Sequence, residues 1–489
     1  MSNELGQLEP RAVWRHFADL NAVPRPSKKE RKIIDFMTTF GQSLGLDTRT
    51  DEIGNVIIRK AATPGMEGRE GVIMQGHLDM VHQKNADTEF DFDSEGIRMR
   101  VDGDWVRAEG TTLGADNGIG VASIMAILAS RDIPHPAIEA LFTVDEESGM
   151  GGALGLKDDV LSGSILLNLD TEDDTELTIG CAGAVNVLAS GAYAPEPVEA
   201  GASAFVLYIR GLVGGHSGMD IHRGRANANK LLNRVLFLAA EGLGLRVGSI
   251  DAGGLRNAIP REARAHVTIA AQQVAAFKKF AAEQAAVLRA EYATTDPNLE
   301  LSLQPEDLPA GQLPLDFQQN LLRAVYACPN GVIRLSPDIE GLVQTSNSMA
   351  RVWAADGRYE INCLVRSAVD SEKLDLATAI RCTFEPIGAK VELSGSYPGW
   401  APRPEAAIVK LMSGLYQELF GEQPAVLACH AGLECGILGA NYPDMQMISF
   451  GPNIRGAHSP DEKVQISSVQ KSWQLLLAAL ERIPPRQAG

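Results

Sequence analysis

A histidine and an aspartate interrupt the apolar segment VIMQGHLDMV, residues 72–81. The segment is typical of a buried strand, whose period of two places His77 and Asp79 on the same side. An aspartate beside an imidazole can fix the position of the ring proton, which leaves the other ring nitrogen free to bind a metal or act as a base. Taken alone, the pair is equally compatible with a hydrogen-bonded strand end.

Similar side chains lie at the ends of other expected strands or at the start of a helix. They are Asp116 after TTLGA, Glu146 and Glu147 after IEALFTV, Asp170 at the end of SILLNLD, and His458 beyond MQMISFG. Singly, each has an ordinary structural explanation: a helix N-cap, a solvated acidic loop or a surface histidine. In an open α/β sheet, however, ligands bind outside the carboxyl ends of the strands, so we expect these side chains to meet at one edge.

Imidazole and carboxylate donors in this mixture are typical of zinc sites, and cobalt or manganese can occupy similar sites. Two ions can share three carboxylates and two histidines if one carboxylate bridges them, and Asp116 is the natural bridge. Adjacent side chains on an extended loop diverge, so only one of Glu146 and Glu147 is expected to bind metal. The other would be free for proton transfer.

The sequence lacks the motifs of other common catalytic and nucleotide-binding sites. The sequence has no G-x-S-x-G elbow, no H-E-x-x-H helix, no P-loop and no G-x-G-x-x-G after a strand. The segment CHAGLECG, residues 429–436, holds two cysteines six positions apart, and no second pair supports a cysteine metal site. The six cysteines of the chain are therefore expected to be reduced and mostly buried.

Length and charge narrow the class of protein. A chain of 489 residues exceeds what one hydrophobic core usually serves, so we expect two domains or a domain with a large insertion. The formal net charge of −18 disfavours nucleic acid and anionic membrane surfaces as partners. The N-terminal residues are acidic where a signal peptide would be basic and then apolar, and no apolar run reaches about 18 residues. We expect a cytoplasmic protein.

The apolar patterns divide the chain into three stretches. Residues 1–188 alternate expected helices (10–21, 27–45 and 118–130) with short apolar strands, as in an α/β sheet. The Ala, Pro, Glu and Gly segment 191–201 marks a change of composition that is typical of a crossing between domains. Residues 189–396 then predict two successive groups of strands and helices, an α+β insertion with a crude internal doubling. Residues 397–489 return to the α/β pattern, so a sheet domain is interrupted by a lid.

Eight motifs carry a resemblance to a known family. They are GHLDMV, GTTLGADNGIG, DEESGMGGA, LLNLD, GGHSG, LRNAIPREA, HAGLECG and GPNIRGAHSPDE. In order and spacing they resemble the bacterial aminoacyl-histidine dipeptidases, a branch of the M20 family of di-zinc peptidases, over essentially the whole chain. The resemblance implies a zinc-peptidase-like catalytic domain, with a mostly parallel sheet flanked by helices, interrupted by a large α+β lid used for dimerisation in the family.

The resemblance also assigns roles at the expected metal site. It implies that His77, Asp116 and Asp170 hold one Zn²⁺, and that Asp116, Glu147 and His458 hold the other. It further implies that Asp79 orients His77 and that Glu146 is the general base and acid.

Four further residues correspond to substrate contacts of the family: His216 of GGHSG, Asn257 of LRNAIP, Arg366 of LVRS and Glu434 of HAGLECG. The guanidinium of Arg366 suits a terminal carboxylate, which it can bind through two parallel hydrogen bonds. Structural alternatives remain open, because Arg366 could pair with an acid of the fold and Asn257 could stabilise a turn.

The implied activity is hydrolysis of dipeptides, preferentially Xaa-His, by a zinc-activated water. A deacylase of N-acyl amino acids or a dipeptidase of broader specificity would use the same metal ligands. An inactive relative that binds metal or peptide is the alternative from another class. Relatives with a smaller lid pair through it and lend the lid histidine across the interface, whereas a doubled lid could supply it within one chain. We expect a homodimer.

Overall fold

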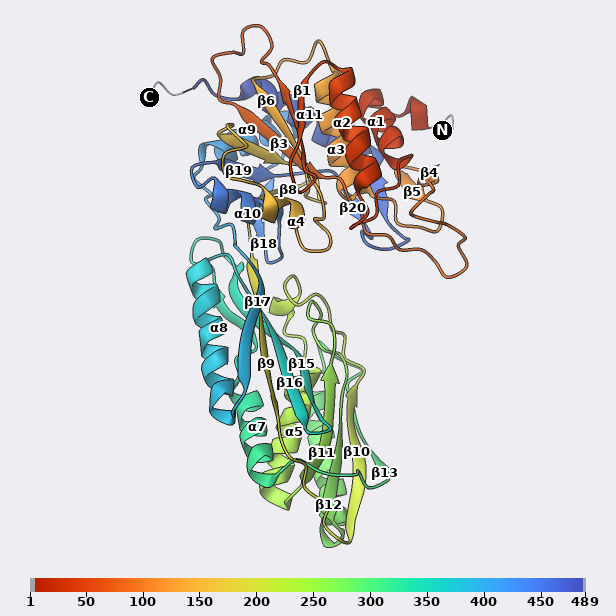
Figure 1. Ribbon diagram of the computed structural model, residues 1–489, viewed down its shortest axis with the longest axis vertical. Helices are drawn as coiled ribbons and strands as arrows, with labels where there is room; N and C mark the ends of the chain where they lie inside the picture. Colours follow the sequence, from red (N-terminus) through yellow and green to blue (C-terminus); the bar gives the residue numbers. More distant parts are fainter. Residues whose placement is uncertain (1–4, 487–489) are drawn as a thin grey trace. The chain divides into compact units, whose positions relative to one another are not determined.

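The structure is a computed structural model that describes residues 5–486, and the chain separates into two compact units. Unit 1 contains residues up to Gly180, Pro402–Ala428 and those from Leu433 onward, whereas unit 2 contains Cys181–Ala401 and Cys429–Gly432. The first unit is thus assembled from separated parts of the sequence, which Figure 1 shows by its mixture of red and blue segments. The Ala, Pro, Glu and Gly segment 191–201 lies within unit 2, where it includes the last two residues of one strand and leads to the next, and the change from unit 1 to unit 2 occurs earlier, after Gly180.

Unit 1 is built on an eight-stranded sheet with the order β1-β2-β6-β3-β7-β19-β8-β18. The strands are β1 Asp47–Thr50, β2 Val56–Lys60, β3 Val72–His77, β6 Ile138–Thr143, β7 Ile165–Asn168, β8 Glu176–Cys181, β18 Ala425–Cys429 and β19 Gln446–Ser449. The central strands β6, β3, β7 and β19 are parallel, whereas β1, β2 and β8 pair antiparallel with their neighbours.

Burial explains the apolar runs in the central strands. Every residue of β3, β6 and β7 is buried, as is usual for parallel strands covered on both faces. The register pairs His77 with Thr143 and Gln75 with Asn168. The carboxyl ends of β3, β6 and β7 therefore lie side by side, and the segments that follow them leave the sheet at one edge.

The helices of unit 1 are α1 Arg11–Asn21, α2 Arg31–Ser43, α3 Ala115–Ala129, α4 Gly151–Gly155, α9 Ala407–Phe420, α10 Glu434–Asn441 and α11 Ile466–Arg482, with a 3₁₀ turn at Leu5–Gln7. In Figure 1, α1, α2 and α3 are grouped beside the sheet. Helix α3 is apolar almost all round and packs on β3 and α1. None of the helices between residues 5 and 486 is long and apolar enough to cross a membrane.

Helix α2 begins at Arg31, later than the predicted residue 27. The reason is tertiary: Ser27 donates its backbone N–H to Met80 O at 3.2 Å, and its hydroxyl donates to Asp79 at 2.8 Å. These bonds hold the segment before α2 against the end of β3, where a helix could not make them.

A second, four-stranded sheet completes unit 1, with the order β20-β21-β5-β4. Its strands are β4 Met99–Asp102, β5 Trp105–Ala108, β20 Ile454–Arg455 and β21 Lys463–Gln465. The apolar side chains of β5 and β21 join a buried cluster with α1 and α3. This sheet was not predicted, because its strands are two to four residues long and two of them come from the far end of the chain.

Unit 2 is a single antiparallel sheet with helices packed against it. The sheet has the order β13-β10-β12-β11-β15-β16-β9-β17, with β14 paired to β15. Its strands are β9 Gly183–Ala192, β10 Ala202–Arg210, β11 Arg246–Gly253, β12 Ala263–Ala270, β13 Glu300–Glu306, β14 Gly331–Leu335, β15 Val343–Ala355, β16 Arg358–Ser367 and β17 Lys390–Tyr397. The helices are α5 Ala228–Leu243, α6 Val274–Glu291, α7 Leu315–Ala327 and α8 Asp370–Phe384, with 3₁₀ turns at Ile221–Arg223, Ala271–Gln273 and Glu385–Ile387. All four α-helices contribute to one core with the sheet, and Figure 1 shows α5, α7 and α8 along one side.

The suspected internal doubling is visible in the strand order. The segments β10-α5-β11-β12-α6-β13 pair in the order β13-β10-β12-β11, and the segments β9-α7-β15-β16-α8-β17 pair in the equivalent order β17-β9-β16-β15. The two halves join where β11 pairs with β15. They are nested rather than successive, since β9 precedes the whole first half. That arrangement was not predicted from the sequence.

Candidate metal and catalytic site

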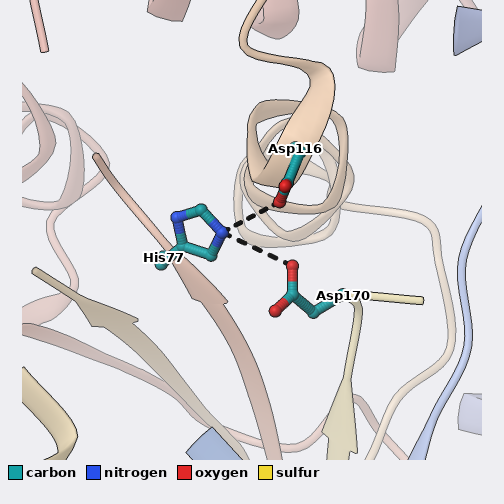
Figure 2. A group of neighbouring side chains, drawn as sticks. All are labelled: His77, Asp116 and Asp170. Carbon is teal, nitrogen blue, oxygen red and sulfur yellow. Dashed lines mark hydrogen bonds and ion pairs between the residues drawn. The ribbon is translucent and has the colours of Figure 1, made fainter. Parts of the chain in front are cut away.

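Three predicted ligands meet at the carboxyl edge of the large sheet. His77 is the last residue of β3, Asp116 lies at the start of α3, and Asp170 follows β7. His77 Nε2 is 3.0 Å from Asp116 Oδ1 and 3.5 Å from Asp170 Oδ1 (Figure 2). The three donor atoms lie within 4.8 Å of one another, close enough to surround one ion.

A second group shares Asp116 with the first. His458 Nε2 is 3.1 Å from Asp116 Oδ2 and 3.0 Å from Glu147 Oε2. The two carboxylate oxygens of Asp116 thus face two different imidazoles, which is the arrangement expected of a bridging ligand. The second oxygen of Glu147 is buried and accepts no hydrogen bond from any residue that the structure describes. A buried oxygen of this kind is commonly satisfied by a water or an ion.

Two of the predicted ligands, Asp116 and His458, have backbone conformations outside regular helix and strand geometry. Asp116 falls within the first turn of α3 but has an extended ψ of 111°, and its peptide bond to Asn117 is cis. His458 lies in the connection between β20 and β21 with a φ of 63°. Both residues therefore depart from the helix and strand conformations that a sequence pattern can predict.

Asp79 organises the two glutamates as well as His77. Its carboxylate accepts the backbone N–H of Glu146 at 3.0 Å and of Glu147 at 3.3 Å, and the hydroxyl of Ser27 at 2.8 Å. The ring Nδ1 of His77 lies 3.1 Å from the backbone oxygen of Asp79 and 3.6 Å from its carboxylate. Asp79 lies beyond the end of β3, so its carbonyl as well as its side chain contacts the imidazole.

Burial and mutual hydrogen bonding shift the titration of the site. Burial raises the pKa of Asp170 to about 6 and raises the pKa of Glu146 well above its ordinary value. Hydrogen bonds to Asp116 and Glu147 raise the pKa of His458 to about 11. Glu146 is also within 4.8 Å of donor atoms of His77 and Glu147, in a third group that could hold an ion.

Glu434 lies in unit 1, beneath the strand ends. It is the first residue of α10, is fully buried, and accepts hydrogen bonds from Gln75 Nε2 at 2.5 Å and Thr143 Oγ1 at 2.6 Å. Burial raises its pKa to about 8.

The other three predicted substrate contacts lie in unit 2. His216 accepts the backbone N–H groups of Gly218 and Met219 at Nδ1, at 3.1 and 2.9 Å, so its neutral ring carries the proton on Nε2. Burial and the charge of Arg366 lower the pKa of His216 to about 4, which keeps the ring neutral. Asn257 is exposed, and its backbone carbonyl oxygen accepts the backbone N–H of Ser217 at 2.8 Å.

Arg366 is buried near the end of β16, where its Nη1 donates to the hydroxyl of Tyr397 at 3.2 Å. No carboxylate ion pair of Arg366 occurs among residues 5–486. The structural alternative considered from the sequence, a pairing with an acid of the fold, is therefore not what the described residues show. His216, Asn257 and Arg366 form one set in unit 2, while Glu434 belongs to unit 1.

Sequence reasoning missed two buried charged residues next to the site, Arg25 and Glu462. Arg25 hydrogen-bonds to backbone oxygens of Leu78 and Asp79, and Glu462 accepts backbone N–H groups of the loop before α3. The only available signal was for Glu462, which lies in the motif GPNIRGAHSPDE together with His458, whereas the segment VPRPS around Arg25 gave none.

Comparison with known proteins decides the family. The model of peptidase family M20/M25/M40 matches residues 73–482, most of the chain. The chain belongs to this family. The M20 peptidase is 43% identical over 484 residues to the cytosol non-specific dipeptidase of Escherichia coli K12, covering 99% of this chain and 100% of that relative.

Solved structures agree with the M20 assignment. The aminoacylhistidine dipeptidase of Vibrio alginolyticus superimposes with a TM-score of 0.92 at 41% identity, and 99% of each chain is covered. The aminopeptidase PepT of Bacillus cereus has a TM-score of 0.56 at 16% identity, with 97% of this chain and 99% of that chain covered, which shows a shared fold only. The family and the mixed α/β fold class predicted from the sequence are confirmed.

Proposed function

We propose that this M20 peptidase is a metal-dependent dipeptidase that acts preferentially on Xaa-His dipeptides and uses two zinc ions. The observation that carries the proposal is the pair of imidazole and carboxylate groups that share Asp116, within a chain related over its full length to two dipeptidases. The carboxylates and imidazoles are hard to borderline donors of the kind that zinc binds in hydrolases. Cobalt or manganese could substitute.

The residues fit this metal assignment. His77, Asp116 and Asp170 would hold one ion, and Asp116, Glu147 and His458 the other. Three carboxylates offset most of the charge of two divalent cations, and Glu146 nearby brings the site close to neutrality. Bound zinc would supply Lewis acidity, which lowers the pKa of a bound water to about 7 and polarises a carbonyl group.

Glu146 is the proposed proton carrier. Its backbone is fixed by Asp79, and its raised pKa gives the carboxylate the basicity to accept a proton from the attacking water. The same carboxyl group then donates that proton to the amine that leaves. Glu147, one position along the chain, already faces His458 and is assigned to metal binding.

The remaining predicted residues are proposed to contact the dipeptide. The Nε2–H of His216 is a neutral donor for the oxygen of the scissile carbonyl, on which negative charge develops. The buried Nε of Arg366 has no hydrogen-bond partner among the described residues, so the guanidinium is available to the terminal carboxylate. Asn257 and Glu434 complete the set. We propose lid residues 189–396 and catalytic residues 1–188 and 397–489 as the functional domains.

A broader dipeptidase is the second candidate, and the name of the Escherichia coli relative, a non-specific dipeptidase, favours it. A side-by-side assay of Xaa-His dipeptides, other dipeptides and N-acyl amino acids separates these possibilities and the deacylase. A preference for Xaa-His dipeptides supports the proposal, and equal rates on all dipeptides support a dipeptidase of broader specificity. Activity that a chelator abolishes and Zn²⁺ restores excludes an inactive relative, whereas no hydrolysis in any arm would overturn the dipeptidase assignment.

Location and assembly also belong to this proposal. We place the protein in the cytoplasm, in line with the name of the Escherichia coli relative, and expect a homodimer. Light scattering of the purified chain measures the assembly directly. A mass near 52.4 kDa, that of one chain, would contradict the dimer.

A further inference from the structure

One buried carboxylate holds the loop that carries Asp116. Glu462 Oε2 accepts the backbone N–H groups of Leu113 and Gly114 at 2.6 and 2.9 Å. Its Oε1 accepts those of Ala115 and Asp116 at 2.7 and 3.2 Å. Four consecutive backbone N–H groups thus donate to one side chain, which is only 2% exposed. Glu462 follows His458 by four residues, so it ties the loop of one predicted ligand to that of another.

Arg25 holds the same loop from its other side. Its Nη2 donates to the backbone oxygen of Gly114, and its Nη1 donates to those of Leu78 and Asp79 at 3.1 and 3.2 Å. The guanidinium is 1% exposed and so joins the end of β3 to the start of α3. Gly114 permits the contact, since its φ is 69° and a Cβ there would lie 2.4 Å from Arg25 Nη2.

Stability alone is a poor explanation for these two residues. Burying an arginine and a glutamate carries a desolvation cost, and well-packed apolar residues of similar volume often serve as well or better. What apolar residues cannot do is fix the positions of several backbone groups at once. The groups fixed here belong to or adjoin His77, Asp79 and Asp116.

We propose that Glu462 and Arg25 are positioning residues, which set the spacing of His77, Asp116 and His458 and thereby the affinity of the site for metal. The inference rests on the proposed metal site. Neither side chain touches a ligand side chain in a hydrogen bond; both act through the backbone of the segments that carry the ligands. Groups that orient metal ligands typically contribute 10- to 100-fold in affinity or activity.

The test compares Glu462→Gln with a matched control, Glu139→Gln. Glu139 is also a buried glutamate of unit 1, 6% exposed, that accepts two backbone N–H groups, from Ser162 and Gly163 at 2.7 and 2.8 Å, and a bond from Arg59 at 2.9 Å. It lies at the opposite end of β6 from the site. The affinity of each full-length metal-free protein for Zn²⁺ is measured by competition with a chromophoric chelator, alongside Tm.

Both variants are expected to lose thermal stability, but only Glu462→Gln should bind Zn²⁺ more weakly, by about 10- to 100-fold. A wild-type affinity in folded Glu462→Gln overturns the proposal, as does an equal loss in Glu139→Gln. If Glu462→Gln does not fold, Arg25→Lys is measured instead, and a wild-type affinity in that variant overturns the proposal. Failure of the proposed function would look different, because the wild-type protein itself would then bind no Zn²⁺ tightly.

Discussion

Two adjacent glutamates occupy different surroundings at this site. Glu147 places one oxygen 3.0 Å from His458, in the group that shares Asp116. Burial and neighbouring carboxylates raise the pKa of Glu146. A carboxyl group with a raised pKa is suited to carry a proton near neutral pH. The sequence alone left open which glutamate had which role, and the resemblance to M20 peptidases made the choice that we propose.

The first prediction concerns Glu146. Glu146→Gln keeps the shape of the side chain but removes its basicity, so kcat should fall by about 10²- to 10⁴-fold while zinc content is retained. Steady-state kinetics and metal analysis of the same sample measure both quantities. The matched control is Asp145→Asn, since Asp145 precedes Glu146 in the chain but pairs with Lys28. A fully active Glu146→Gln enzyme would refute the assignment.

The second prediction concerns the hydrogen bonds of Glu434. Thr143→Val preserves shape but removes the hydroxyl that donates to the buried Glu434 carboxyl group at 2.6 Å. The free energy of unfolding should fall by about 1–3 kcal/mol, as for other buried polar groups left without a partner. Urea unfolding measures the change. Thr39→Val, at an exposed position on α2, is the control and should change stability by less than about 0.5 kcal/mol.

At the scale of elements, the segment 429–432 belongs to unit 2 although it is far along the chain from the rest of that unit. Its His430 is 6% exposed, and its Nε2 lies 2.7 Å from Ser346 Oγ on β15. Burial and the charge of Arg366 lower the pKa of His430 to about 3. The docked segment therefore requires a neutral imidazole.

A pH dependence of stability follows as the third prediction. An unfolded histidine titrates near its ordinary pKa of about 6.5, so between that pH and about 3 the unfolded state binds more protons than the folded state. The stability that the neutral His430 allows is fully present above pH 6.5. As the pH falls below 6.5, the free energy of unfolding decreases by about 1.4 kcal/mol per pH unit. Urea unfolding from pH 7 to 5 should show a shallower slope in His430→Gln than in wild type. Equal slopes would contradict the prediction.

Predictability from sequence varied by element. The apolar runs of β3, β6 and β7 are buried on both faces and were predicted together with the polar residues at their ends. Strand β14, in contrast, is mostly exposed and carries no comparable pattern. Arg25 and Glu462 act through bonds to residues 53 to 349 positions away. No local periodicity indicates such contacts, which is why the sequence allowed a prediction of the metal ligands but not of Arg25 and Glu462.

At the scale of the whole molecule, each unit has its own buried core, and all five predicted metal ligands belong to unit 1. Units with separate cores can unfold in separate steps. Metal binding should then stabilise one unit and leave the other unchanged.

The fourth prediction is a calorimetric scan with two transitions, of which Zn²⁺ raises only the transition of unit 1. Free zinc at 100 times its Kd should add about 2.7 kcal/mol, and a chelator should remove it. Asn227→Ala identifies the other transition, because Asn227 caps α5 in unit 2 by accepting the N–H groups of Asn229 and Lys230. Loss of that cap should cost at least about 1 kcal/mol. Equal shifts of both transitions by zinc would contradict the prediction.

The nesting of the two halves of unit 2 has a consequence on the ribosome. Strand β9 ends at Ala192, but its partners β16 and β17 begin at Arg358 and Lys390. Translation proceeds at about 5–20 residues per second, so β9 remains without a neighbouring strand for roughly ten to thirty seconds. The first half, Ala202–Glu306, completes its own strand order in that interval. The nascent chain thus carries a finished module beside an open strand, and that open strand is where a cotranslational chaperone would be needed.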